Sequence, residues 1–131
     1  MNTLLCNISS KKDMAKMIKE SARVLKPKGL LIISNPHPAF ENHSFPKRRE
    51  RTFSKEFNYF ENGQRYILKL YKTDGSILEV ENFHYPLGTY VELISKQKMK
   101  ITKILEPESP LKYEEEKRIP VYMILVAQKD G

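Results

Sequence analysis

Hydrophobic residues first recur at helical spacing in the part of the chain before residue 26. Four of them are three or four residues apart: Met14, Ile18, Ala22 and Leu25. This period, with lysines between the apolar positions, predicts an amphipathic helix from about Ser10 to Arg23. Ser10 followed by Asp13 resembles a capping box at the start of this helix. Pro27 and Gly29 then end the helix and turn the chain.

The next hydrophobic run, Leu30–Ile33, is apolar at every position. A continuous run is typical of a strand with both faces covered, as in a parallel sheet flanked by helices. Residues 2–6 are mostly apolar and fit the tail of an earlier strand. The strand tail, the helix and the buried strand together predict a βαβ unit with a right-handed crossover. Its carboxyl-terminal edge continues into Ser34–Pro38, and open parallel sheets bind ligands at that edge.

Two β-prone runs later in the chain lie on either side of a turn signal. Tyr66–Tyr71 and Ile77–Phe83 flank Asp74-Gly75, which predicts a β-hairpin. Residues 40–60 have no clean period, so we expect a loop or lid there with one helical turn. Three further elements are expected: a helix over 87–94, a strand over 99–105 and a buried strand over 121–127.

The length of 131 residues allows one domain with one hydrophobic core. No stretch approaches the roughly 18–20 apolar residues that a membrane span requires, and the first residues lack the features of a signal peptide. Cys6 is the single cysteine, so no disulfide can form within the chain. Together with His37, His43 and His84 it matches no metal-ligand spacing. We therefore expect a cytoplasmic protein with no metal site and no membrane association.

The net charge of +7 comes from 23 Lys+Arg against 16 Asp+Glu, and the densest basic cluster lies at residues 47–51. Such a charge raises non-specific affinity for nucleic acid and other anions. No RNA-binding aromatic signature, zinc-finger spacing or helix-turn-helix signal accompanies the cluster. We expect weak, sequence-blind association and no specific nucleic-acid partner.

Several short motifs follow one another in a fixed order along the chain. They are RVLKPKG at 23–29, HPAF at 37–40, YPLGTY at 85–90, EP at 106–107 and RIP at 118–120. The set resembles the C-terminal half of the class I S-adenosylmethionine-dependent methyltransferases. The resemblance implies an α/β fold, namely a partial Rossmann-like methyltransferase sheet with a β-hairpin cap inserted over about 41–86. Residues 1–131 then form a single domain, the C-terminal portion of that fold.

Two features depart from the family's pattern. The family binds its cofactor through a glycine-rich loop after the first strand, and no such loop precedes the βαβ unit here. Lys28 stands where the family usually has glycine. The sequence therefore describes half of an enzyme, and we expect a homo-oligomer or a partner chain that supplies the missing strands. Because the sheet would otherwise end at an unprotected border, we do not expect a stable monomer.

The resemblance also implies roles for individual residues. His37 follows the buried strand, where a methyl acceptor should lie, and is a candidate general base or orienting group; the alternative is a structural histidine. His84 is a second catalytic candidate, and Phe40, Tyr85 and Tyr90 are candidates for binding the acceptor, although aromatic residues in such places are often core. Asn2 falls where the family's fourth strand meets the cofactor and is the candidate cofactor contact.

The implied function is methyl transfer from S-adenosylmethionine to a small-molecule acceptor, competent only when the missing half is supplied. The alternative is a non-catalytic binding or assembly subunit that kept the acceptor-side surface. A third hypothesis is a basic nucleic-acid-binding module. Methyl transfer depends mainly on in-line positioning, so the chemistry demands no single catalytic residue.

Overall fold

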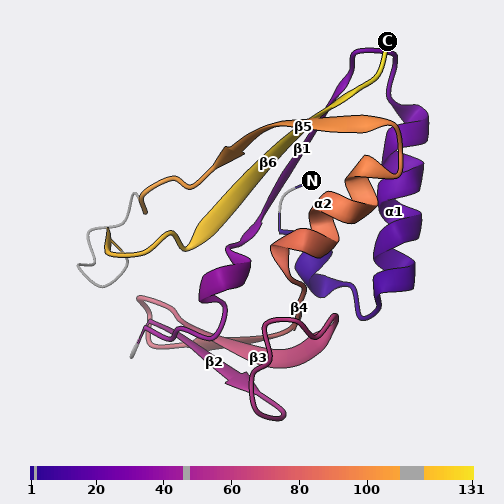
Figure 1. Cartoon of the computed structure of the whole chain (residues 1–131). Coiled ribbons are helices and arrows are strands. Elements are labelled where there is room, and N and C mark those ends of the chain that lie inside the picture. Colours follow the sequence, from indigo (N-terminus) through magenta and orange to yellow (C-terminus); the bar gives the residue numbers. More distant parts are fainter. Residues whose placement is uncertain (2, 46–47, 110–116) are drawn as a thin grey trace.

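The computed structural model describes residues 1, 3–45, 48–109 and 117–131, which form two small sheets with two helices (Figure 1). The elements, in chain order, are η1 (Leu5–Asn7), α1 (Lys11–Val24), β1 (Leu30–Pro36), η2 (Pro38–Phe40), β2 (Arg49–Phe53), β3 (Gln64–Tyr71), β4 (Ile77–His84), α2 (Leu87–Ser95), β5 (Met99–Leu105) and β6 (Tyr122–Lys129). One sheet has the order β1-β6-β5 and the other β2-β3-β4. The helices α1 and α2 lie along the first sheet, and the second sheet lies beyond the end of β1 (Figure 1).

The first helix forms where the hydrophobic spacing predicts it. The Ser10 side chain accepts a hydrogen bond from the Asp13 backbone amide at 3.2 Å, which satisfies one of the free donors at the helix start. Its apolar stripe is buried at Met14, Ile18 and Ala22. The predicted capping and packing of this helix are therefore confirmed.

In the first sheet, β6 lies between β1 and β5 and is antiparallel to both. The start of the chain lies along the other side of β1. The Ser34 amide donates to the Met1 carbonyl at 2.8 Å, and the Thr3 amide donates to the Ser34 carbonyl at 2.6 Å. In parallel strands, one residue forms backbone hydrogen bonds with two residues of the neighbouring strand that are two positions apart. The expected parallel contact is therefore present, although Leu5–Asn7 turns into a short 3₁₀ helix instead of continuing as a strand.

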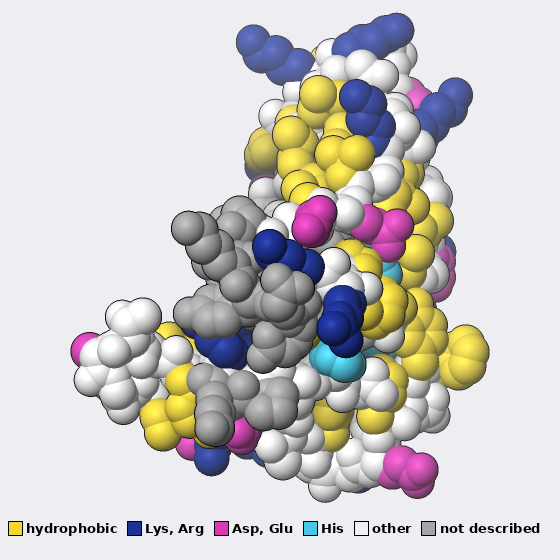
Figure 2. Space-filling view, turned by 90° about the vertical axis from the view of Figure 1, so that its left-hand side faces the viewer, with side chains coloured by type: hydrophobic (Ala, Val, Ile, Leu, Met, Phe, Trp, Pro, Cys, Tyr) yellow, Lys and Arg dark blue, Asp and Glu magenta, His cyan; other side chains and the backbone are white. Residues whose placement is uncertain are grey.

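The expectation that both faces of Leu30–Ile33 are covered is wrong. Leu31 and Ile33 are 7% and 1% exposed, whereas Leu30 and Ile32 are 52% and 50% exposed. The reason is that the two described helices pack on one face of this sheet only (Figure 1). Side chains on the opposite face form what we call the helix-free face: Leu30, Ile32, Leu105 and Tyr122. Figure 2 shows hydrophobic side chains gathered on the side of the molecule that lies away from the helices.

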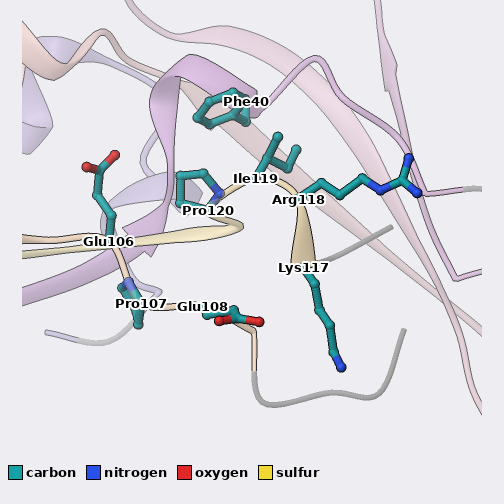
Figure 3. Close-up of a pocket in the computed structure, with 8 residues that line it drawn as sticks. All are labelled: Phe40, Glu106, Pro107, Glu108, Lys117, Arg118, Ile119 and Pro120. Carbon is teal, nitrogen blue, oxygen red and sulfur yellow. The ribbon is translucent and has the colours of Figure 1, made fainter. Parts of the chain in front are cut away.

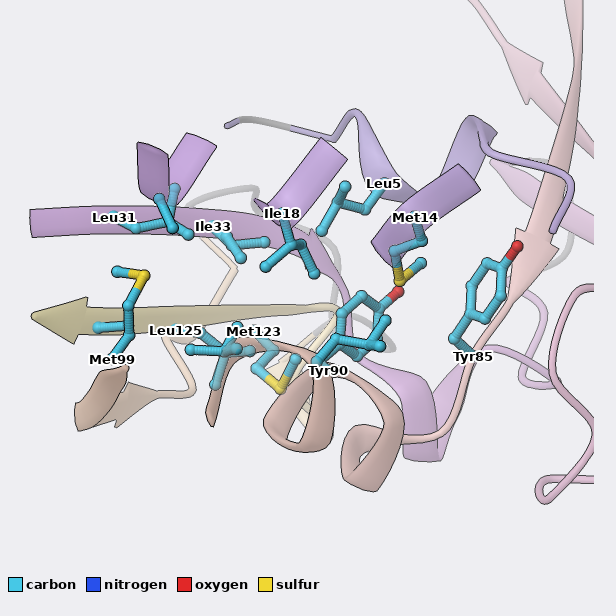
Figure 4. Packing of buried hydrophobic residues seen from close by; sticks show 14 of the residues in the cluster. Leu5, Met14, Ile18, Leu31, Ile33, Tyr85, Tyr90, Met99, Met123 and Leu125 are labelled. Atoms are coloured by element: carbon cyan, nitrogen blue, oxygen red, sulfur yellow. The ribbon is translucent and has the colours of Figure 1, made fainter. Parts of the chain in front are cut away.

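The hydrophobic core lies between the covered face of this sheet and the two helices (Figure 4). It includes Leu5, Met14, Ile18, Leu31, Ile33, Tyr85, Tyr90, Met99, Met123 and Leu125. Burying aliphatic and aromatic side chains stabilises the fold by about 1.5–3 kcal/mol each. This core holds β1 and its carboxyl-terminal end in a fixed position, from which the candidate site extends.

The second sheet contains the predicted hairpin and one strand that was not predicted. β3 and β4 are joined by a turn in which the Asp74 carboxylate accepts from the Ser76 amide and Gly75 has a φ of +87°. β2 pairs with β3 in the region expected to be a loop, so that expectation is wrong for Arg49–Phe53. Because two inward positions of β2 are Arg49 and Arg51, the strand has no hydrophobic alternation to reveal it.

Candidate functional site

His37 lies directly after β1, at its carboxyl-terminal end. Its Nδ1 accepts a hydrogen bond from the Ala39 amide at 3.2 Å, which begins the turn η2. Its Nε2 lies 2.6 Å from Oε2 of Glu106. Because Nδ1 accepts, Nε2 carries the proton and donates it to the Glu106 carboxylate. The His37 side chain is 9% exposed and that of Glu106 is 54% exposed, so the pair joins the interior to the surface.

A cavity of about 340 Å³ lies against the Glu106 side chain of this pair (Figure 3). Its walls come from the turn η2 and from the two chain segments that follow β5 and precede β6. The residues that line it are Phe40, Glu106, Pro107, Glu108, Lys117, Arg118, Ile119 and Pro120. The Phe40 ring also lies 5.1 Å from the His37 ring, centre to centre. The volume suits a small molecule, and the lining mixes apolar surface with acidic and basic groups.

Glu106 is the carboxylate of this site that His37 orients, and it can hydrogen-bond a ligand or accept its proton. Its carboxylate lines the cavity and is half exposed, while His37 holds it by one hydrogen bond. In the sequence, Glu106 is part of the EP motif at 106–107, and the motif by itself does not place it in the site. The signal that could have found it is its position after a strand that runs parallel to β1, since the carboxyl ends of parallel strands share an edge.

His84 lies elsewhere, in a buried polar cluster. It is fully buried, with Nδ1 3.0 Å from Oε1 of Glu41 and Nε2 2.7 Å from the Tyr59 carbonyl. Oε2 of Glu41 accepts a hydrogen bond from the Tyr66 hydroxyl at 2.5 Å. Both nitrogens of His84 are therefore engaged by protein groups. This geometry connects β3 and β4 to the segment after η2, and a catalytic role for His84 stays a prediction.

Tyr85 and Tyr90 are both part of the core. Tyr85 is 0% exposed and its hydroxyl donates to the Ile8 carbonyl, and Tyr90 is 1% exposed. Burial raises the pKa of Tyr85 to about 12 and raises that of Tyr90 well above its usual range. Of the predicted site residues, the structure brings His37 and Phe40 together and leaves both tyrosines inside. Asn2, the candidate cofactor contact, lies outside the described residues.

Other kinds of site find little support in the structure. The described residues contain no group of three or more side chains able to hold a metal ion. Burial raises the pKa of the Cys6 thiol to about 12, so this cysteine is a poor nucleophile. In the basic cluster, Arg49 and Arg51 lie on the inner face of their sheet and do not form a continuous basic surface. The described part of the chain contains no helix long and apolar enough to cross a membrane.

Comparison with solved structures identifies the fold. The whole chain is similar to a protein of Listeria monocytogenes assigned as an S-adenosylmethionine-dependent methyltransferase, with a TM-score of 0.67 and 22% identity over 99% of this chain and 59% of that one. S-adenosylmethionine-dependent methyltransferases from Mesorhizobium loti and Clostridium acetobutylicum give TM-scores of 0.62 and 0.61 at 18% and 13% identity. For both, the similarity covers 98% of this chain, against 59% and 56% of theirs. No family model matches the sequence, and no curated protein matches it.

The chain therefore has a partial class I methyltransferase fold, as its motifs predict. It spans less than three fifths of the length of these similar structures. The structural similarity establishes the fold. Because the sequence identities are all below one quarter, the activity has to be argued from the site.

The described residues do not by themselves fit S-adenosylmethionine. A glycine-rich loop between a strand and the following helix would hold it. In this structure neither the connection from β1 to η2 nor the connection from β4 to α2 contains a glycine, and Gly88 lies within the first turn of α2 without a second glycine nearby.

Proposed function

We propose that this chain is the acceptor-side part of an S-adenosylmethionine-dependent methyltransferase that acts on a small molecule. The observation that supports this most is the match of nearly the whole chain to part of such proteins, with a TM-score of 0.67. The cofactor supplies an already activated methyl group, so the protein's main task is to position the acceptor. The cavity beside His37 and Glu106 is where we propose that the acceptor binds.

In this proposal Glu106 hydrogen-bonds the acceptor and takes up its proton where one must be lost. His37 is a positioning residue, because its Nε2–H fixes the direction of the Glu106 carboxylate. Phe40 supplies an apolar wall, and Lys117 and Arg118 bring positive charge to the lining of the cavity.

We further propose that the polypeptide that carries the missing strands also covers the helix-free face. About two fifths of each similar structure has no counterpart in this chain. The face is apolar and half exposed at Leu30 and Ile32, and sheets of this architecture are covered on both faces. The occupant is a polypeptide with a glycine-rich strand–loop–helix, either continuous with this chain or separate from it.

The test is cofactor binding with and without that polypeptide. The coding sequence upstream of the Met1 codon, or a neighbouring gene, would supply the candidate. We expect calorimetry to detect no binding of S-adenosylmethionine to the present chain alone. Binding should appear when the chain is mixed with the candidate polypeptide. Ile32→Lys on the helix-free face should abolish this gain in cofactor binding. Ile77→Lys, at an equally exposed position (54%) on the hairpin, is the matched control and should leave it intact.

Micromolar binding of S-adenosylmethionine to the chain alone would contradict the proposed division of roles. A complex that forms through the helix-free face but binds no cofactor would favour the second candidate, a non-catalytic assembly subunit. The observation behind that candidate is the lack of a glycine-rich loop in this chain.

A further inference from the structure

A second cavity, of about 210 Å³, lies between the two sheets. One wall is the inner face of β2-β3-β4, and the other is formed by the start of the chain and by the adjoining ends of β1 and β6. The residues that matter for its chemistry are Arg49, Arg51, Leu68, Leu70, Val80 and Tyr122. None of them belongs to the cavity beside His37.

Strand register explains why two arginines face this cavity. Arg49 lies opposite Leu70 and Arg51 lies opposite Leu68, so both arginines lie on the same face of the sheet as these leucines. The outer face of the same sheet carries cross-strand ion pairs, Arg65–Glu81 at 2.6 Å and Lys69–Glu79 at 3.6 Å. These outer charges are thus paired with opposite charges, whereas neither inner arginine forms an ion pair with a carboxylate of the described residues.

The inner arginines leave hydrogen-bonding capacity unused. The Nε atoms of Arg49 and Arg51 are buried and have no hydrogen-bond partner. Nη1 of Arg51 donates to the carbonyls of Phe40 and His43 at 3.3 and 2.9 Å, and the Arg49 guanidinium lies over the Tyr122 ring at 5.4 Å. Buried charged donors without a partner are destabilising, so this arrangement calls for an acceptor.

No carboxylate among the described residues provides that acceptor. Among the described residues, those that line the cavity include no Asp or Glu. The nearest buried carboxylate, Glu41, raises the pKa of Arg51 against the larger lowering effect of burial, but its two oxygens already bind Tyr66 and His84. The lining of the cavity therefore combines the positive charge of Arg49 and Arg51 with the apolar side chains Leu68 and Val80.

We propose that this cavity binds a small molecule that carries a carboxylate or phosphate on a compact apolar body. Guanidinium groups bind both oxyanions through paired N–H donors. The volume is below the roughly 300–1,000 Å³ of drug-sized ligand sites, which limits the ligand to a small one. The inference goes beyond the proposed function, since such binding requires neither the cofactor nor the missing strands.

The test is a titration of the chain followed by NMR at the arginine Nε–H groups and the methyl groups of Leu68, Leu70 and Val80. The probes are hexanoate, hexyl phosphate, neutral hexanol and methionine, whose carboxylate stands for that of the cofactor. We expect saturable shifts at both sets of signals with hexanoate or hexyl phosphate, and the stronger of the two identifies the anion. Equal binding of hexanol, binding of methionine alone, or no saturable binding by any probe would overturn the proposal.

Matched variants locate the site. Arg49→Gln should weaken hexanoate or hexyl phosphate binding by about tenfold or more, whereas Arg65→Gln on the outer face of the same sheet should leave it unchanged. Leu70→Phe fills the cavity and keeps both arginines, so it should also abolish binding of the anion. This variant replaces Arg49→Gln in the test if Arg49→Gln does not fold. Equal losses in Arg49→Gln and Arg65→Gln would show that general charge, and not the cavity, attracts the anion.

Discussion

His37 and Glu106 are 69 residues apart in the sequence, and their side chains meet at 2.6 Å. The sheet order explains the contact. β1 and β5 are both antiparallel to β6, which lies between them, so they run parallel to each other. Their carboxyl ends lie at the same edge of the sheet, and His37 and Glu106 are the residues that follow those ends. The pair thus forms at the edge where ligands bind in open α/β sheets.

The first prediction concerns the proton on His37. Because Nδ1 accepts from the Ala39 amide, neutral His37 should be the Nε2–H tautomer. Two-bond ¹H–¹⁵N NMR correlations of the ring measure this directly. Glu106→Gln should shift the Nε2–H signal, whereas Glu108→Gln, which lines the same cavity without contacting His37, should not. Observation of the Nδ1–H tautomer in the wild type would contradict the assigned geometry.

The second prediction concerns the buried Glu41 carboxylate. Tyr66→Phe removes the hydrogen bond to its Oε2 in a site that water does not reach, which should lower the free energy of unfolding by about 1–3 kcal/mol. Tyr71→Phe is the matched control, because Tyr71 is partly exposed and the loss of its hydroxyl leaves no buried carboxylate without a partner. Urea denaturation of the two variants provides the comparison. Equal losses would show that the Tyr66 hydroxyl contributes no more than a surface one.

The third prediction concerns the turn before β1. Lys28 has a φ of +66°, a left-handed conformation that costs an L-residue roughly 1–2 kcal/mol and costs glycine little. Lys28→Gly should raise the free energy of unfolding by up to about 1 kcal/mol, since glycine's greater freedom in the unfolded chain offsets part of the gain. Lys26→Gly, without a positive φ, should destabilise the protein instead. A higher melting temperature for Lys26→Gly than for Lys28→Gly would refute this account.

The fourth prediction concerns stability at alkaline pH. Burial raises the pKa of Cys6 from 9.0 to about 12, so the folded protein keeps the thiol protonated while the unfolded chain loses the proton. The stabilisation is fully present below pH 9.0 and is lost as the pH rises toward about 12. Denaturation between about pH 7.5 and pH 10.5 should show this fall, and Cys6→Ala should flatten it. An unchanged slope in Cys6→Ala would assign the fall to the buried tyrosines alone.

The sequence alone determined the elements whose causes are local. The capped helix Lys11–Val24 depends on Ser10 and on apolar residues three or four positions apart, and the hairpin depends on Gly75 between two β-prone runs. Each signal lies within a few residues of the structure that it produces, so it can be read without knowledge of the rest of the chain. The family motifs were likewise readable, and the structural comparison confirms the fold that they imply.

Tertiary structure decided what depends on residues far apart in the chain. Leu30 and Leu31 are chemically alike, and only the position of the helices makes one half exposed and the other buried. Strand pairing places Arg49 on the inner face of its sheet, although the charged residues next to it in the sequence are typical of a surface segment. The contact between His37 and Glu106 required β6, which comes after both of them in the chain, to lie between β1 and β5. Such contacts arise from the packing of whole elements, and no spacing within the sequence encodes them.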